Sequence, residues 1–579
     1  MRLLEIKINM GIDMMILQKI KIITWYKYLQ AIVGCFIFTT VMLPSEAVSA
    51  DHPVVSTSDG QIKGQNNAGI NTYLGIPYAL PPVGPLRWKP PVAVRHWNGI
   101  LDASHFASNC PQVTEFGAFA GPASINEDCL YLNVFTTDNL KNTEKKPVIV
   151  WIHGGANIDG SSSDYDGSKL ARGGSKGVET VVVTLNYRLG LFGTFSHPAI
   201  NSKNFLWGNY GILDQQLALQ WVKRNIQAFG GDPDNVTIGG QSAGAYNVGA
   251  NVVSPLSHGL FRHAIFQSSP AVAISLPTAE DTTKKGIGFA EAAGCQGSDD
   301  EIARCLRSLS ASRILQLQGT PAASGPFVQM FPFIDGKIIP IPTEEALKKG
   351  DFNKVSIMGG STHDEMTFLT GIMQYFSGQP MTTQQYNQAI TPGAFCVGCK
   401  KDAMPEGVAK YYPLSKYDNN AMIAYTRVTT DIVKCREFHM LSFVASQVPT
   451  YAYDFTYQNA PYYFPKMPGF QPLAAHTIDI QFIFDKFHGG PLGVNLDQKS
   501  GMPRDLDSSE LILSDQMISF WTRFAESGNP NGTGDTPWPR FHSDNSGTYY
   551  VQDIPESTKT VSQMRSEYQC DFWDNNVKY

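Results

Sequence analysis

The sequence Gly240-Gln-Ser-Ala-Gly244 places one serine between two glycines, a spacing in which a serine hydroxyl can act as a nucleophile. The β-branched residues 236–238 before it predict a buried strand, and the small residues after it predict a helix that begins at once. A tight turn between the two would expose the hydroxyl of Ser242, and the helix N-terminus would favour negative charge beside it. The same spacing also occurs in glycine-rich turns with a solvated serine, so the rest of the chain must decide.

A serine nucleophile needs a base, a carboxylate that orients the base, and N–H donors for the oxyanion. The apolar residues 147–152 predict a strand that ends at His153-Gly-Gly-Ala156. Small residues there let backbone N–H groups approach a substrate. We assign the N–H groups of Gly155, Ala156 and Ala243 to an oxyanion hole, with a plain Gly-Gly turn as the alternative.

The carboxylate and the base remain open at this point. In α/β-hydrolases the acid follows the serine along the chain and the histidine comes last. Residues 354–358 predict a later strand, and both Asp364 and Glu365 follow its carboxyl end, so spacing does not separate them. Of four later histidines, His476 ranks first because it precedes an apolar element. The others are His488, which ranks second, His439 and His542.

The elements that must position these residues alternate between strands and helices. Nearly continuous apolar runs, typical of strands covered on both faces, alternate with segments of helical periodicity. Residues 73–88, rich in proline, predict a surface loop. Because the motifs are scattered and must meet in one site, residues 51–579 are expected to form one domain. The expected strands are 126–135, 147–152, 179–185, 236–238, 354–358 and 450–455, and the expected helices are 214–229, 426–445 and 511–526.

The composition of the 579 residues, 42% hydrophobic and 17% charged, is that of a globular protein. The net charge is −6 and no basic block is present, which argues against a nucleic-acid partner. No spacing of His, Cys and acidic residues implies a metal, and nothing implies another cofactor.

Residues 1–50 predict a signal peptide that is removed. Lysines precede an apolar run over 31–43, and Val48-Ser-Ala50 suits cleavage before Asp51. Cys35 lies inside the apolar run rather than after it, which argues against a lipid anchor. The run is short for a membrane span. We therefore expect a secreted or periplasmic protein without a stable membrane anchor.

The eight cysteines after residue 50 suggest disulfides in an exported chain. Close spacing favours Cys110–Cys129 and Cys295–Cys305. Cys396-Val-Gly-Cys399 has no second CxxC motif and no nearby histidine, so a local or crossed disulfide is favoured over a redox or metal site.

The chain resembles the type B carboxylesterases, a family that includes carboxylesterases, cholinesterases and bile-salt or fungal lipases. The resemblance covers nearly everything after Asp51. It implies an α/β-hydrolase fold, with a large, mostly parallel central sheet flanked by helices and with helical insertions around an active-site gorge. It rests on Glu127-Asp-Cys-Leu-Tyr-Leu-Asn133, Trp151-Ile-His-Gly-Gly155, Asn186-Tyr-Arg-Leu-Gly190, Asn209-Tyr-Gly-Ile-Leu-Asp-Gln215, Phe229-Gly-Gly-Asp-Pro233, Gly240-Gln-Ser-Ala-Gly244 and Ala525-Glu-Ser-Gly-Asn-Pro-Asn531.

By this resemblance Ser242 is the nucleophile, Glu365 the acid and His476 the base. Asp479 falls where the family often has a buried glutamate behind the catalytic groups, and Gln241 stands where cholinesterases have glutamate. The resemblance also implies a salt bridge and three disulfides, namely Arg87–Glu127, Cys110–Cys129, Cys295–Cys305 and Cys435–Cys570.

The expected function is that of a secreted serine carboxylesterase that hydrolyses neutral, small-molecule esters through an acyl-enzyme. The first disulfide loop offers Phe116 and Phe119 but no tryptophan, and Gln241 is neutral, which argues against choline esters. The alternatives are a lipase on long-chain acylglycerol or sterol esters and, from another class, an adhesion protein without catalysis. The oligomeric state is not predicted.

Overall fold

The computed structural model describes residues 52–113, 122–138, 144–201, 207–269, 276–318, 331–396, 398–485, 487, 494–544 and 546–577. The predicted signal peptide, residues 1–50, lies outside them. So do Cys35, Phe116, Phe119 and His488. Residues Ala50–Tyr579 form one compact unit, to which the following description applies.

The centre of this unit is a sheet in which eleven strands of the described chain pair in the order β14-β13-β12-β11-β10-β9-β7-β8-β6-β4-β3. The neighbours from β8 through β7 and β9 to β13 run parallel, and antiparallel pairs close both edges. A small second sheet has the order β1-β2-β5. The strands are β1 Val54–Ser56, β2 Gln61–Lys63, β3 Gln65–Asn67, β4 Ile70–Pro77, β5 Ile100–Asp102, β6 Tyr131–Thr137, β7 Lys146–Ile152, β8 Val181–Leu185, β9 Gly231–Gln241, β10 His263–Gln267, β11 Ser356–Thr362, β12 Thr450–Phe455, β13 Thr548–Gln552 and β14 Ser557–Thr560.

Strand β7 is nearly apolar throughout because both of its faces are covered. Every residue of β7 is buried, and its side chains alternate between two apolar cores. Val148, Val150 and Ile152 belong to one core, and Ile149 and Trp151 belong to the other. This is the period-two alternation of a strand inside a layered α/β structure.

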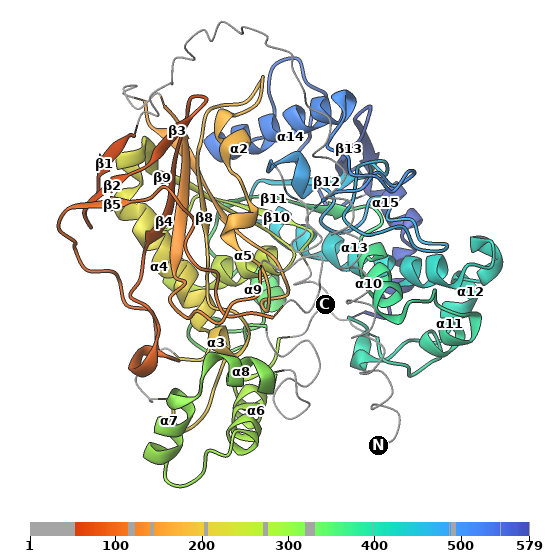
Figure 1. Cartoon of the computed structure of the whole chain (residues 1–579). Helices are drawn as coiled ribbons and strands as arrows, with labels where there is room; N and C mark the ends of the chain where they lie inside the picture. Colours follow the sequence, from red (N-terminus) through yellow and green to blue (C-terminus); the bar gives the residue numbers. More distant parts are fainter. Residues whose placement is uncertain are drawn as a thin grey trace, which may run out of the picture. The chain divides into compact units, whose positions relative to one another are not determined.

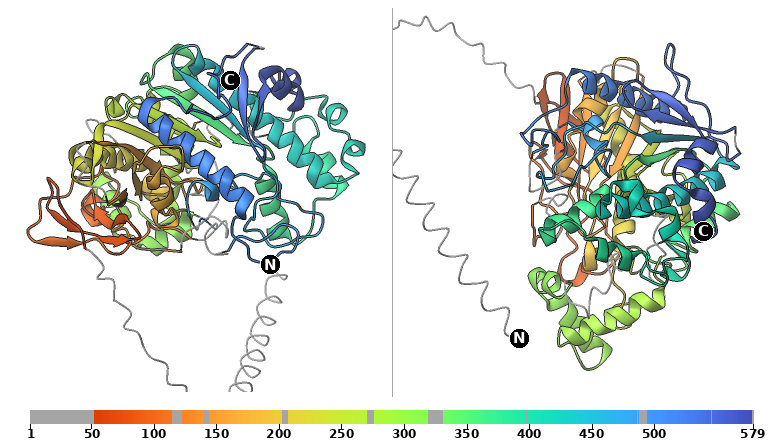
Figure 2. Two further views of the ribbon diagram at one scale, coloured as in Figure 1. Left: turned by 90° about the horizontal axis from the view of Figure 1, so that it is seen from above. Right: turned by 90° about the vertical axis from the view of Figure 1, so that its right-hand side faces the viewer.

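Helices supply the two outer layers. Apolar residues of α4, α5 and α13 share the core of Val148, whereas those of α2 and α14 share the core of Trp151, so the two groups cover opposite faces (Figures 1 and 2). Helices α6, α7 and α8 lie together away from the sheet (Figure 1). The helices are α2 Ser168–Arg172, α3 Gly190–Gly193, α4 Tyr210–Asn225, α5 Ala243–Val253, α6 Ala279–Ala292, α7 Asp299–Ser308, α8 Ala311–Gln318, α9 Thr343–Lys349, α10 Thr367–Ser377, α11 Thr383–Ala389, α12 Val408–Tyr411, α13 Ala421–Ala445, α14 Ser508–Ser527, α15 Val561–Glu567 and α16 Cys570–Trp573.

The boundaries of the elements differ from the sequence predictions at identifiable residues. Helix α14 begins before residue 511 because the side chain of Asp507 caps it and accepts hydrogen bonds from the N–H groups of Ser509 and Glu510. The predicted surface loop over residues 73–88 is wrong at both ends. Strand β4 continues to Pro77, and Trp88 is buried and donates its indole N–H to the carbonyl of Leu191.

The register of the parallel strands aligns their carboxyl ends. Gln241 of β9 pairs with Gln267 of β10, which pairs with Gly360 of β11, and Ile152 of β7 pairs with Gly240. The residues that follow these strands therefore emerge along one edge of the sheet, where ligands of α/β proteins usually bind.

Candidate active site

Ser242 is the single residue between strand β9 and helix α5. Its backbone has φ 58° and ψ −126°, a conformation that is sterically unfavourable for a residue with a Cβ atom. Such strain persists only where the surroundings fix the turn. The structure therefore contains the sharp strand–turn–helix geometry that the Gly240–Gly244 motif predicts.

The glycines around Ser242 are required by close packing against the end of β7. A Cβ atom on Gly244 would lie 1.9 Å from the carbonyl oxygen of Ile152, and one on Gly240 would lie 2.6 Å from the carbonyl carbon of Gly244. A Cβ atom on Gly154 would lie 3.1 Å from that of Ser242. The loop after β7 thus passes directly beside the serine, and only glycines leave room for it.

That loop presents backbone N–H groups next to Ser242. Gly155, Ala156 and Asn157 have φ values of 95°, 53° and 60° in succession. In the described chain, the N–H groups of Gly155, Ala156 and Ala243 donate to no acceptor, and Ala243 is the first residue of α5. Free N–H groups in a tight loop and at a helix N-terminus suit a developing negative charge.

Neighbouring elements hold the loop in place. The Tyr187 hydroxyl donates to the carbonyl of His153 (2.7 Å), and the Asn247 side chain donates to Oδ1 of Asn157 (2.7 Å). The N–H of Gly190 donates to the carbonyl of Asn157 (2.6 Å). Burial lowers the pKa of His153 to about 4, so this histidine is a neutral packing residue at physiological pH.

Glu365 lies three residues beyond β11 and is buried. Its Oε1 atom meets Nδ1 of His476 in a short hydrogen bond. Its Oε2 atom accepts hydrogen bonds from the N–H of Thr362 (3.1 Å), the hydroxyl of Thr362 (2.6 Å) and the hydroxyl of Ser268 (3.1 Å). Both carboxylate oxygens are therefore occupied by groups that favour the charged form.

Two opposing effects act on this carboxyl group. Burial acts to raise the pKa of Glu365, but attraction to His476, the hydrogen bonds from His476 and Thr362, and the charge of Lys434 together bring that pKa below its ordinary value. Glu365 is thus ionised at neutral pH and oriented toward the imidazole.

Asp364, the neighbouring alternative, points elsewhere. Its Oδ2 atom accepts hydrogen bonds from the side chain of Gln458 (2.8 Å) and from the N–H of Ala474 (3.2 Å). The structure brings Glu365, and not Asp364, against His476.

His476 is fixed by its backbone as well as by Glu365. Its N–H donates to the carbonyl of Glu365 (3.2 Å), and its carbonyl accepts from the Tyr462 hydroxyl (3.0 Å). The ring of Phe368 lies beside the imidazole, with 5.7 Å between the centroids. The amide nitrogen of Gln241 lies 3.1 Å from Nε2 and 3.4 Å from Nδ1 of His476.

The hydroxyl of Ser242 makes no hydrogen bond to His476 or to any other residue that the structure describes. Hydrogen bonds between catalytic groups are often long in unliganded enzymes and shorten when substrate binds. The amide nitrogen of Gln241 is nearly equidistant from the two ring nitrogens, so it does not lie on the outward axis of Nε2 along which Ser242 would approach.

The remaining histidine candidates do not join this group. His439 contacts Asp574, with 2.9 Å between Nε2 and Oδ1, and His542 is exposed in a loop. His488 lies outside the described residues, as do Phe116 and Phe119 of the first disulfide loop.

Asp479 lies behind the pair of Glu365 and His476. It is 1% exposed, and its Oδ2 atom accepts a hydrogen bond from the side chain of Gln267 (2.8 Å). Burial, and then the charge of Glu365, raise the pKa of Asp479 to about 7. This carboxyl group is therefore partly protonated at neutral pH.

Sequence reasoning missed Ser268, Thr362 and Lys434, three residues that support Glu365. Ser268 and Thr362 lie at the carboxyl ends of β10 and β11, where a polar residue directly after an apolar strand was the available signal. Lys434, on α13, gave no signal that separates it from an ordinary surface lysine.

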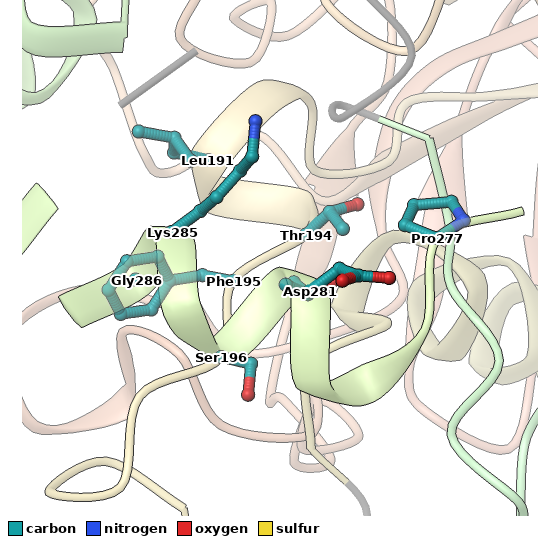
Figure 3. A pocket seen from close by; sticks show the side chains of 9 residues that line it. Leu191, Thr194, Phe195, Ser196, Pro277, Asp281, Lys285 and Gly286 are labelled. Carbon is teal, nitrogen blue, oxygen red and sulfur yellow. The ribbon is translucent and has the colours of Figure 1, made fainter. Parts of the chain in front are cut away.

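A separate small cavity lies between residues 191–196 and helix α6 (Figure 3). Its volume is about 20 Å³, and Phe195, Asp281 and Lys285 are among its lining residues. None of the candidate catalytic residues lines it, and it has room for little more than one water molecule.

Disulfides and ion pairs stabilise the framework. The structure contains the three implied disulfides and also a local Cys396–Cys399 bridge. Arg87 and Glu127 form the implied salt bridge, with Nε donating to Oε2 at 2.7 Å. Over the described ranges, His, Cys, Asp and Glu form no cluster suited to a metal ion. No helix in the same ranges is both long and apolar enough to cross a bilayer.

The architecture is that of the α/β hydrolases. A solved structure of PNB esterase is similar to the chain with a TM-score of 0.70 and 30% identity, over 90% of this chain and 99% of the other. Residues 51–573 match the family model described as "Carboxylesterase family". The chain therefore belongs to the carboxylesterase family, and it is a carboxylic-ester hydrolase that acts on small-molecule esters.

Individual relatives agree with this assignment. The para-nitrobenzyl esterase of Bacillus subtilis (strain 168) is 33% identical over 88% of this chain and 98% of its own length. The acylcarnitine hydrolase of Mus musculus is 33% identical over 84% of this chain and 85% of its own length. The cocaine esterase of Homo sapiens is 32% identical over 84% and 86%, respectively.

Proposed function

We propose that the protein is a secreted serine carboxylesterase that hydrolyses neutral esters through an acyl-enzyme, with Ser242 as nucleophile, His476 as base and Glu365 as acid. The observation that carries this proposal is the hydrogen bond between the buried Glu365 and His476, next to the strained turn of Ser242. The N–H groups of Gly155, Ala156 and Ala243 form the oxyanion hole.

In the first half of the reaction, Nε2 of His476 takes the proton of Ser242 as the serine oxygen attacks the ester carbonyl. The Gly155, Ala156 and Ala243 N–H groups stabilise the oxyanion that develops. His476 then donates its proton to the departing alcohol, which leaves the acyl group on Ser242.

In the second half, His476 activates a water molecule that attacks the acyl-enzyme, and the proton returns to Ser242 as the acid leaves. Glu365 holds the Nδ1 proton and stabilises the imidazolium that forms in each half. Gln241 and Asp479 lie next to the catalytic groups and act through them.

The preference for neutral esters rests on the neutral side chain of Gln241 beside His476. The names of the relatives cover acylcarnitine, cocaine and para-nitrobenzyl compounds, so they do not select one alcohol group. Export after removal of residues 1–50, with 51–579 as the single catalytic domain, is supported by the four disulfides.

The test compares Ser242→Ala with the matched control Ser446→Ala, which changes an exposed serine at the end of α13. With p-nitrophenyl esters of increasing acyl length, Ser242→Ala should lose about 10⁶-fold in kcat, and the control should match the unaltered enzyme. Near-normal turnover in a folded Ser242→Ala protein would end the proposal, whereas an unaltered protein with no turnover would favour the adhesion alternative.

The same series of esters separates an esterase from a lipase. An esterase follows ordinary saturation with dissolved short-chain esters. A rate that rises abruptly once a long-chain ester exceeds its solubility limit would instead indicate a lipase.

A further inference from the structure

Lys434 of α13 is a buried lysine whose ammonium group meets the ends of two strands. The side chain is 2% exposed. Nζ donates to Oδ1 of Asp454 (2.7 Å), to the hydroxyl of Ser361 (3.0 Å) and to the carbonyl of Thr362 (3.3 Å). A buried ammonium is stable only with such a full set of partners, so these contacts are fixed features of the core.

The contacts of Lys434 lead directly to the acid of the proposed triad. Thr362, whose carbonyl accepts from Lys434, donates both its N–H and its hydroxyl to Oε2 of Glu365. The positive charge of Lys434 is also among the causes that bring the pKa of Glu365 below its ordinary value, after the opposing effect of burial and the attraction to His476. Lys434 thus acts on Glu365 through the backbone of β11 and through its charge.

Other charged groups surround this lysine. Asp454 is shared, because Lys559 of β14 donates to its Oδ2 atom (2.9 Å) from the other side. Lys559 therefore offers a matched comparison, since it is a second lysine on the same carboxylate but has no contact with Thr362. The titratable groups around Lys434 and Glu365 are Glu437 on α13, Asp454 on β12, His363 and Glu365 after β11, His476 and Asp479 in the following segment, Lys559 on β14, Glu567 on α15 and the ring of Tyr568.

We infer that Lys434 is a positioning residue of the hydrolytic site, which holds the end of β11 and keeps Glu365 ionised and aligned with His476. This inference rests on the proposed roles of Glu365 and His476. The buried residues behind the proposed triad would then contribute to the reaction as well as to stability. The charge at residue 434 would help to set the pH range in which the enzyme is active.

The direction of the pH effect follows from charge. The active form has an ionised Glu365 and a neutral His476, so a nearby positive charge disfavours protonation of the pair. When that charge is lost, protons bind the pair more tightly and the acidic limb of kcat/KM moves to higher pH.

The experiment compares Lys434→Met with Lys559→Met in the full-length secreted enzyme. Lys434→Met should lower kcat by about 10- to 100-fold with KM within about threefold, and should move the acidic limb upward by about one pH unit. Lys559→Met removes a lysine from the same carboxylate and should leave the limb in place. Lys434→Arg keeps the charge, so the acidic limb of its kcat/KM profile should lie at the same pH as in the unaltered enzyme, whatever its kcat.

Thermal unfolding of each variant serves as the control for folding. If Lys434→Met does not fold, Lys434→Gln removes the charge but keeps an N–H donor for the carbonyl of Thr362, and it carries the same expectation for the acidic limb. Equal acidic limbs in the two lysine variants would overturn the inference, because Lys434 would then be a structural residue only. Full activity of Ser242→Ala or Glu365→Gln would instead refute the proposed function.

Discussion

The substitution Glu365→Gln tests the proposed triad most sharply, because the structure fixes how the new amide must lie. Oε2 of Glu365 faces the backbone N–H of Thr362, which can only donate, and two hydroxyl groups. An NH2 group placed there would leave that N–H unsatisfied, at about 1–3 kcal/mol. The glutamine oxygen therefore takes the Oε2 position, and its NH2 group takes the Oε1 position toward His476.

This orientation puts the imidazole in the wrong tautomer. The glutamine NH2 group would donate to Nδ1 of His476, so the ring proton would move to Nε2. A protonated Nε2 cannot accept the proton of Ser242. The expected loss is about 10⁴-fold in kcat, equivalent to about 5.4 kcal/mol in the activation free energy.

The neighbouring substitution Asp364→Asn is the control. The asparagine oxygen can still accept hydrogen bonds from the Gln458 side chain and the Ala474 N–H, the partners that Asp364 has in the structure. The expected change in kcat is less than about threefold. Initial rates with p-nitrophenyl butyrate, together with thermal unfolding, measure both variants. A larger loss for Asp364→Asn than for Glu365→Gln would show that the acid has been assigned one residue too late.

Two further predictions concern pH and substrate charge. Asp479 has its pKa raised to about 7 in the fold, above its unfolded value, so the fold loses stability as pH rises from about 4 through 7. The unfolding free energy should therefore fall between pH 5 and pH 8, and in Asp479→Asn this fall should be smaller by about 2–3 kcal/mol. Urea titrations that give the same fall for the variant and the unaltered protein would contradict this. For substrate charge, a neutral butyrate thioester should exceed butyrylthiocholine by roughly 10²-fold in kcat/KM, since Gln241 supplies no negative charge for a cation. Equal values would reveal a cation site elsewhere.

The sequence allowed the central sheet and the turn of Ser242 to be predicted because both leave strong local patterns. Strand β12 was predicted with its observed bounds, since its aromatic and apolar residues are typical of a buried strand. The close approach of backbone to backbone explains why Gly240 and Gly244 mark the turn so clearly.

The choice between Asp364 and Glu365 was beyond local patterns, because adjacent residues in a turn point in different directions. The resemblance to a family favoured Glu365, and the structure places that residue against His476. The catalytic roles themselves stay predictions until the variants are measured.

The supporting residues were missed for a different reason. Lys434 is a charged residue in a predicted helix, and Asp454 is a charged residue in a predicted strand, so each is expected to face solvent. They are buried because they pair with each other across 20 positions of sequence. Such a pair has no fixed spacing, and only the packing of α13 against β12 creates it.

Strands β10 and β11 are parallel neighbours, yet the chain between them departs from the sheet and forms α6, α7, α8 and α9. The pairing of the two strands does not depend on how long this excursion is. Ser268 at the end of β10 and Glu365 beyond β11 therefore keep their relation when the excursion changes. The exposed turn over residues 296–298, between α6 and α7, is therefore the place in this interval where evolution or a protein engineer can insert a foreign segment, whereas the helices themselves contribute buried residues to the core.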